Sequence, residues 1–164
     1  MQVITITSIY DAQEDRIALS VADAEKDTRK LWLSRNMLNR LVPALCDGLE
    51  KQIKKSEDAS PDTLSAAQHY AQLQARIGQK PAQAVQTNEQ TPQGLVTAID
   101  IKDLPDGGKA IFFRCGQSVE TATMQLNANS LRQWLDTLKN ASTNADWGLD
   151  IWPEWMQRAS NEKT

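Results

Sequence analysis

The feature that most constrains the fold of this chain is a strand-strand-strand-helix order that occurs twice. In the first copy, a strand with Leu31 and Leu33 on one face ends at Leu33, and Ser34 takes the N-cap position of an amphipathic helix. Leu126 and Asn127 repeat this junction 93 residues later, and the apolar spacing of the two helices agrees. The strands are expected at residues 3–10, 16–21, 28–33, 95–102, 110–115 and 119–126. We therefore expect two βββα units, either a duplicated unit or a chance agreement of two strand-to-helix junctions.

A further helix and a polar connector separate the two units. Ser60 and Pro61 take the cap and first positions of a helix that runs to about Ile77 and ends at Gly78. Residues 79–93 hold five glutamines and two prolines, which is typical of a linker. The sequence thus predicts an α+β fold of order βββαα-linker-βββα, with antiparallel strands that form a sandwich or one sheet covered by helices.

The 164 residues are expected to form a single domain, residues 1–164, because neither half has enough strands for a stable core of its own. Its parts are half-units at about 1–78 and 94–142, the linker 79–93 and a tryptophan-rich tail at 143–164.

Composition excludes several classes of function. Lys and Arg total 18 against 21 Asp and Glu, and neither half is basic, which argues against a general nucleic-acid or membrane-surface binder. No apolar run approaches the roughly 18 residues of a spanning helix, and no secretory signal is recognised at the N-terminus. Two cysteines form no disulfide framework. We expect a cytoplasmic protein with no membrane partner.

The residues that could carry chemistry are few. His69 has no nucleophile or carboxylate near it in the sequence, and Cys46 and Cys115 are expected to be buried thiols. The acidic residues at 100, 103 and 106 are three apart, which does not match the alternate spacing of a calcium loop. We therefore predict no catalytic residue, no metal site, no cofactor and no enzymatic activity.

The tail is the least ordinary segment, because three of the five tryptophans lie within nine residues. Trp147, Trp152 and Trp155, with the adjacent Met156, are the candidate partner surface, since tryptophan is a frequent interface anchor. The alternative is that the tail folds back and closes the core. The sequence leaves both open.

The order of three strands, a helical pair, further strands and a closing helix resembles the head domain shared by eukaryotic double-strand-break repair scaffolds and centriole-assembly proteins. The resemblance implies a small β-sandwich with a helix-turn-helix inserted midway, and a protein that dimerises and scaffolds. In that family a long heptad helix follows the head, whereas the helix expected after Asn127 is about a dozen residues and Pro153 follows it. Strand-rich units that end in a helix are also similar to small repeat proteins that bind single-stranded nucleic acid.

Two functions from different classes follow. The first is a non-enzymatic protein-interaction or scaffold module that self-associates and whose contacts use sheet edges and the tryptophan-rich tail. The second is a protein that binds single-stranded nucleic acid on its sheet, with Trp32, Phe112 and Phe113 as the strand aromatics available for stacking.

Overall fold

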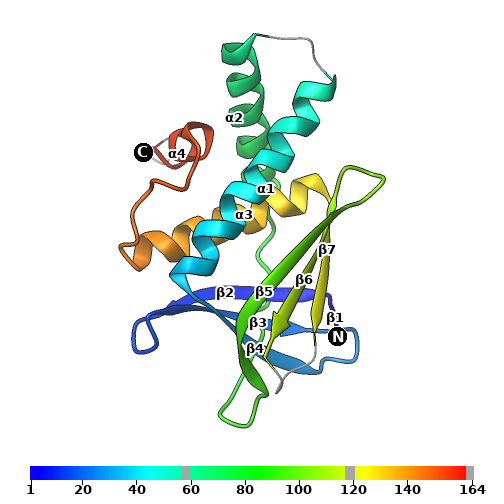
Figure 1. Ribbon diagram of the computed structural model, residues 1–164, viewed down its shortest axis with the longest axis vertical. Coiled ribbons are helices and arrows are strands. Elements are labelled where there is room, and N and C mark those ends of the chain that lie inside the picture. Colours follow the sequence, from blue (N-terminus) through cyan, green and yellow to red (C-terminus); the bar gives the residue numbers. More distant parts are fainter. Residues whose placement is uncertain (57–59, 117–120, 162–164) are drawn as a thin grey trace.

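The elements follow the predicted order with two additions, a short first strand and a last helix (Figure 1). The computed structural model describes residues 1–56, 60–116 and 121–161. Its strands are β1 (Gln2–Val3), β2 (Thr5–Asp11), β3 (Arg16–Ala22), β4 (Thr28–Leu33), β5 (Gln93–Asp103), β6 (Lys109–Cys115) and β7 (Ala122–Leu126). Its helices are α1 (Arg35–Ser56), α2 (Pro61–Ile77), α3 (Ala128–Asn144) and α4 (Glu154–Asn161). The fold is α+β, as expected.

The seven strands form one mixed sheet in the order β1-β7-β6-β5-β4-β3-β2. The two predicted meanders, β2-β3-β4 and β5-β6-β7, are antiparallel. They join in parallel, because Lys30 in β4 pairs with Gln93 in β5, and β1 also lies parallel to β7. The expectation of antiparallel strands alone is therefore wrong. The helical pair and the connector together form a crossover of the length that parallel neighbours require.

The N-terminal segment brings the two ends of this sheet together. β1 and β2 are consecutive in the chain yet lie at opposite ends of the strand order. The amide of Thr123 on β7 donates to the carbonyl of Met1, whereas the next residue after β1, Ile4, donates its amide to the carbonyl of Ala22 on β3. The sheet is therefore curled and nearly closed, and its two terminal edges are less open than those of a flat sheet.

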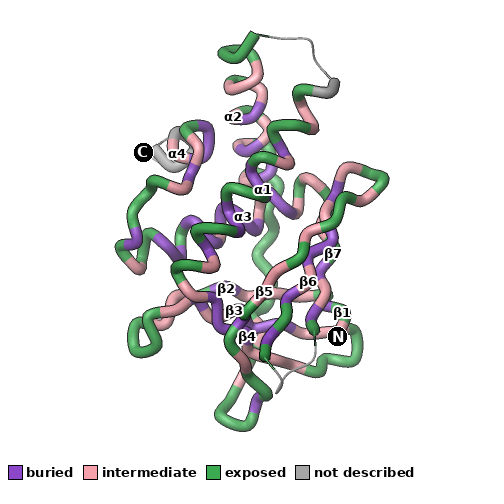
Figure 2. Tube along the Cα trace, in the orientation of Figure 1, coloured by how far each residue is buried: buried purple, intermediate pink, exposed green. Residues whose placement is uncertain are grey.

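The core fills the concave side of the sheet, under α1 and α3 (Figure 2). The predicted helix stripes point into it, so Leu38, Leu45, Leu131 and Leu135 are fully buried. Trp134 joins the two layers, because its indole Nε1 donates to Ser8 Oγ on β2 at 3.1 Å.

Three predicted helix starts are confirmed by their capping bonds. The side chains of Ser34, Ser60 and Asn127 accept from the backbone amides three residues on, at 3.2, 3.4 and 2.8 Å. α1 continues through Pro43, although proline disfavours a helix interior. Apolar residues on both sides of Pro43 pack into the core, which offsets the one helical hydrogen bond that proline cannot make.

α2 and the second half of α1 extend away from the sheet as a helical hairpin (Figure 1). The polarity of α2 is inverted. Gln68 and Gln72 are buried, at 2% and 0% exposure, whereas Tyr70 and Ile77 are 64% and 77% exposed. An ordinary surface helix buries its apolar residues and exposes its glutamines. The outward face of α2 therefore carries large apolar side chains, with the exposed Gln74 beside them.

Residues 79–92 of the predicted linker have no helix or strand but lie against the sheet, and Gln93 already belongs to β5. The amide of Val85 donates to Thr7 Oγ1 at 2.9 Å, and the amide of Lys30 donates to the carbonyl of Pro92 at 3.0 Å. Thr91 is buried. The segment carries the chain from the end of α2 back to the start of β5, and so makes the parallel pairing possible.

Each half of the chain is thus a three-stranded meander followed by a helix, and one sheet runs through both halves. A duplicated origin of the two halves stays a prediction.

Candidate functional site

The four tail residues proposed as a partner surface are Trp147, Trp152, Trp155 and Met156, and the structure buries all of them to 9% exposure or less. Trp147 packs edge-on against Tyr10, with ring centroids 5.7 Å apart. The tail therefore closes the core, because burial of the large indole rings removes much apolar surface from water and stabilises the fold. An accessible surface for a partner has to be sought elsewhere in the molecule.

Polar contacts hold the tail in place. Lys139 Nζ donates to the carbonyl of Met156 at 2.8 Å, and Trp155 Nε1 donates to Glu50 Oε1 at 2.9 Å. The guanidinium of Arg132 lies 5.4 Å from the centre of the Trp155 ring. Met156 belongs to α4 and is fully buried. These bonds tie α4 to α1 and α3.

A buried polar layer lies beneath α2. Gln68 Nε2 donates to the carbonyl of Leu49 at 3.0 Å, and Arg132 Nη2 donates to Gln68 Oε1 at 2.6 Å. Arg76 forms an ion pair with Asp136 on α3. Burial lowers the pKa of Arg132 to about 10, so it remains charged at neutral pH. Because these bonds link one helix to another, the layer has a packing role.

The two thiols are buried and free. Burial, assisted by the nearby Glu50 carboxylate, raises the pKa of Cys46 to about 12, and burial also raises the pKa of Cys115. Both are therefore protonated near neutral pH and are poor nucleophiles. Within the described ranges, no group of three or more His, Cys, Asp and Glu side chains is placed to hold a metal ion. None of the helices described is both long and apolar enough to cross a membrane.

The three strand aromatics do not share one accessible face. Phe113 is fully buried and meets Trp134 edge-on at 6.2 Å. Trp32 is 9% exposed, and its Nε1 donates to Gln93 Oε1 at 2.9 Å. Phe112 is partly exposed, and Lys102 Nζ lies 5.1 Å from its ring centre.

An open strand edge lies in the middle of the sheet. β5 pairs with β4 only through Gln93, Gly94 and Leu95, whereas its pairing with β6 continues to Asp103. From residue 97 to residue 102, the edge of β5 that faces away from β6 has no strand beside it. Across residues 1–56, 60–116 and 121–161, no hydrogen bond reaches a backbone group on that edge. Every second residue of an antiparallel strand points its N–H and C=O away from its partner, so these groups are available.

α1 runs beside this edge, and a groove separates the two. The first part of the groove, a hollow of about 400 Å³, lies between residues 97–101 and one face of α1. The apolar side chains that line it are Met37, Leu41, Ala44, Ile99 and Ile101. The two isoleucines keep partial exposure, whereas Ile111, opposite Ile101 on β6, is fully buried. The inner face of β5 is thus left partly uncovered at the open edge.

The groove continues along α1 toward the β5–β6 hairpin as a second hollow of about 470 Å³, which Ala44 also lines. The hairpin tip closes this end. Gly107 has a φ of 81°, a conformation that favours glycine, and a Cβ there would overlap the side-chain amide of Gln52 on α1. Six strand residues span about 20 Å, which is the length of groove that a partner strand would follow.

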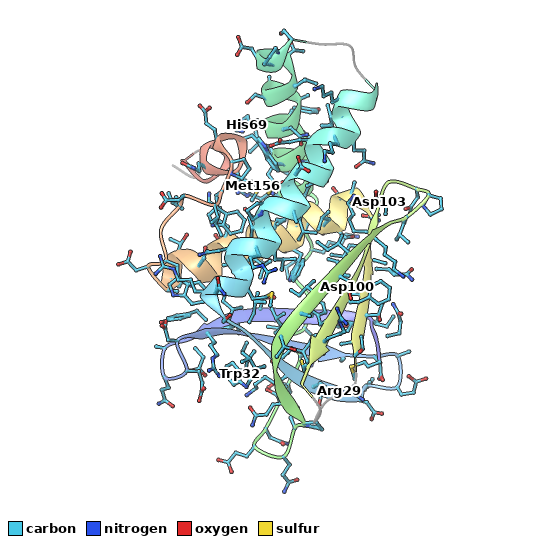
Figure 3. All side chains as sticks on the ribbon, viewed as in Figure 1. Arg29, Trp32, His69, Asp100, Asp103 and Met156 are labelled. Carbon is cyan, nitrogen blue, oxygen red and sulfur yellow. The ribbon has the colours of Figure 1, made fainter. Side chains whose placement is uncertain are left out.

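The charges around the groove are mostly paired. Arg114 forms an ion pair with Asp100 at 2.9 Å, and Lys51 forms one with Asp47 at 2.7 Å, whose hydrogen bond raises the pKa of Lys51. Asp100 and Asp103, which pairs with Lys109, follow one another along β5 (Figure 3). Arg40 is exposed at the start of the groove, and it forms no ion pair with any residue in the part of the chain that the structure describes. The groove therefore carries a surplus positive charge at its Arg40 end.

Sequence reasoning located strands at 28–33 and 95–102 but did not identify this site. A usable signal was the mismatch in length, because the strand expected at 95–102 has eight residues and the one expected at 28–33 has six. A long strand beside a short one must leave part of an edge uncovered, unless another segment covers it.

A scan of protein-family models, a search of curated proteins and a search of solved structures each found no match for this chain.

Proposed function

We infer that this chain is a non-enzymatic protein-interaction module that binds an extended segment of a partner protein by strand addition to β5. The observation that carries the proposal is the uncovered edge at residues 97–102, beside a groove with an apolar lining. An extended peptide that adds to such an edge gains main-chain hydrogen bonds, and alternate side chains enter the groove.

The geometry supports strand addition over other modes of docking. α1 and the open stretch of β5 run in the same direction (Figure 1). One face of α1 therefore lines the groove along the whole open edge. A peptide of about six residues would have β5 on one side and α1 on the other. Each net hydrogen bond contributes on the order of 1 kcal/mol, so the apolar contacts with α1 are needed for useful affinity.

Panning a phage-displayed library of linear nonapeptides on the full chain tests the proposal. Ala44 is exposed on α1 and lines both hollows, so Ala44→Trp should fill the groove while the helix still folds. Asn39→Trp places the same ring at an exposed position of α1 that does not line the groove. Peptides enriched on the wild type should bind Asn39→Trp equally well and lose binding to Ala44→Trp.

Hydrogen exchange identifies the mode of binding. An enriched peptide should slow exchange of backbone amides between residues 97 and 102, because strand addition pairs them. Failure to enrich any peptide, or binding that survives Ala44→Trp, would contradict the proposal. So would bound peptide that leaves those amides unprotected while it protects another region.

The self-association expected from the sequence is proposed for a different surface. Ala66, Tyr70, Leu73 and Ile77 recur at spacings of four and three along the outward face of α2 and carry no charge; we call them the α2 stripe. A dimer with twofold symmetry uses the same surface patch on both copies, so that patch must be complementary to itself. Antiparallel packing of two α2 stripes meets this need and places the exposed Asp62 at one end near Lys80 at the other.

Binding of single-stranded nucleic acid has less support. Stacking platforms use several exposed aromatic rings on one face, and Phe112 alone of the three strand aromatics considered is more than marginally exposed. The net charge of −3 adds no electrostatic attraction for a phosphate backbone.

A further inference from the structure

We propose that the β5 groove selects an extended peptide with aliphatic side chains at alternate positions and a carboxylate at the end that lies near Arg40. This inference rests on the proposed strand addition and names the chemistry of the segment that binds there.

The alternation follows from strand geometry. Successive side chains of an added strand point to opposite sides. One set would face Met37, Leu41 and Ala44 on α1 and the partly uncovered Ile99 and Ile101 on β5. These five side chains have no hydrogen-bond donor, and their one acceptor is the weakly accepting thioether sulfur of Met37, so a polar side chain placed among them would lose its water without gaining a comparable partner. The groove therefore favours aliphatic residues two positions apart.

The carboxylate follows from the charge around the first hollow. Arg40 on α1 and Arg114 on β6 both line it, and Asp100 neutralises Arg114. Arg40 forms no ion pair with the residues at 1–56, 60–116 and 121–161. A guanidinium binds a carboxylate through two parallel hydrogen bonds, which gives direction as well as affinity. An acidic partner residue would complete the charge balance of this end.

The opposite end of the groove does not attract a charge in the same way. Lys51 is paired with Asp47, and Lys109 is paired with Asp103. Because both cations there already have carboxylate partners, the electrostatic preference is confined to the Arg40 end. A bound peptide should therefore have one defined orientation.

Two sources offer a carboxylate, an acidic side chain and a C-terminal carboxyl group. Synthetic versions of the peptides enriched by panning distinguish them. In one arm the acidic residue is changed to its amide, Glu to Gln or Asp to Asn, and in the other arm the C-terminus is amidated. The arm that removes the carboxylate bound by the groove should raise the dissociation constant about tenfold, as expected for loss of a charge-assisted hydrogen bond.

Charge reversal then assigns the partner of that carboxylate. Arg40→Glu should bind the parent peptide at least tenfold more weakly and should bind a version with Lys in place of the acidic residue better than the wild type does. Lys54→Glu makes the same kind of change at an exposed position of α1 that does not line the groove, and it should leave both affinities unchanged. Arg40→Gln provides a second variant, which should lose the preference without reversing it.

The outcomes separate this inference from the proposed function. One outcome is that enriched peptides lose binding to Ala44→Trp but bind the wild type equally well with and without their carboxylates. That outcome would overturn the proposed selectivity and would leave strand addition supported. Enriched peptides with no alternation of aliphatic residues would also overturn it. Binding that ignores Ala44→Trp would overturn the proposed function itself.

Discussion

Trp155 donates its indole N–H to the Glu50 carboxylate at 2.9 Å, which ties the last helix of the chain to the first. The two residues lie 105 positions apart. The same indole ring meets the guanidinium of Arg132 from α3. Glu50 is exposed while Trp155 is 4% exposed, so the bond forms at the margin of the core. The tryptophan-rich tail therefore contributes to stability.

Substitution of Trp155 should separate its packing from its hydrogen bond. Trp155→Phe keeps an aromatic ring and leaves Glu50 in water. It should lower the free energy of unfolding by about 1 kcal/mol for the lost hydrogen bond, and by a smaller amount for the lost packing. Trp155→Ala should lower the free energy of unfolding by about 3–5 kcal/mol because it opens a large cavity. Urea unfolding followed by far-ultraviolet circular dichroism measures both. An unchanged midpoint for Trp155→Ala would show that the tail does not close the core.

The ion pair between Arg76 and Asp136 should be sensitive to loss of its carboxylate. The side chains of Arg76 and Asp136 are only 16% and 6% exposed. Asp136→Asn leaves Arg76 without its anion in a poorly solvated site, which should cost about 3–5 kcal/mol of unfolding free energy. Asp47→Asn is the matched control, because Asp47 and Lys51 are both largely exposed and their pair should matter little. Equal effects of the two substitutions would contradict the buried-pair interpretation.

The stability of the protein should fall above about pH 9 because of Cys46. An unfolded thiol loses its proton near pH 8.5, whereas folded Cys46 keeps its proton until about pH 12. The unfolded state then binds fewer protons than the folded state, so stability is lost as pH rises, by about 1 kcal/mol between pH 9 and 10. Arg132, with its pKa lowered to about 10, acts in the opposite sense above pH 10.

The window from pH 8 to 10 therefore reports on the buried thiols, and because burial also raises the pKa of Cys115, the variant Cys46→Ala is needed to isolate the contribution of Cys46. Urea unfolding of the wild type and of Cys46→Ala across this window should give a shallower decline for the variant. The slopes are compared and not the absolute stabilities, since removal of a buried sulfur lowers stability at every pH. Parallel curves for the two proteins would show that Cys46 does not titrate as its burial requires.

The α2 stripe should support weak association of two copies. The α2 stripe, from Ala66 to Ile77, extends only about 17 Å along the helix, so we expect an interface smaller than the roughly 1,200 Å² of stable complexes. Sedimentation of the wild type should therefore show a fraction of dimer that rises as the protein concentration is raised into the high micromolar range. Tyr70→Glu should abolish it, and Gln74→Glu, exposed on the same helix but outside the α2 stripe, should weaken it far less. A wild type that stays monomeric at every concentration would refute the proposed surface.

Much of the secondary structure could be predicted because its signals are local. A cap such as Ser34, Ser60 or Asn127 acts on an amide three residues away, so the sequence contains the whole interaction. The missed helix α4 had a local signal as well. Pro153 precedes it, and its carbonyl accepts from the amides of Met156 and Gln157, a position at a helix start that tolerates proline.

The candidate site could be predicted only in part. Sheet edges were expected to serve as contact surfaces, but the edges at the two ends of the sheet are brought together by the N-terminal segment, and the open edge lies within the sheet. Alternation along β5 located the strand, but it contained no information about which residues lie beside Thr97 or Ile101. The four tail residues illustrate the same difficulty, because tryptophans that close a core and tryptophans that bind a partner look alike in sequence.

Residue patterns a few positions long were thus enough for the fold class, the three capped helices and the two meanders. Folding in three dimensions was needed to pair Lys30 with Gln93, to bury Trp155 against α1, and to leave one stretch of β5 uncovered beside Arg40. The division has a physical cause. Caps and alternation depend on the backbone within one turn or strand, whereas an open edge depends on where a connector of about 15 residues returns the chain to the sheet.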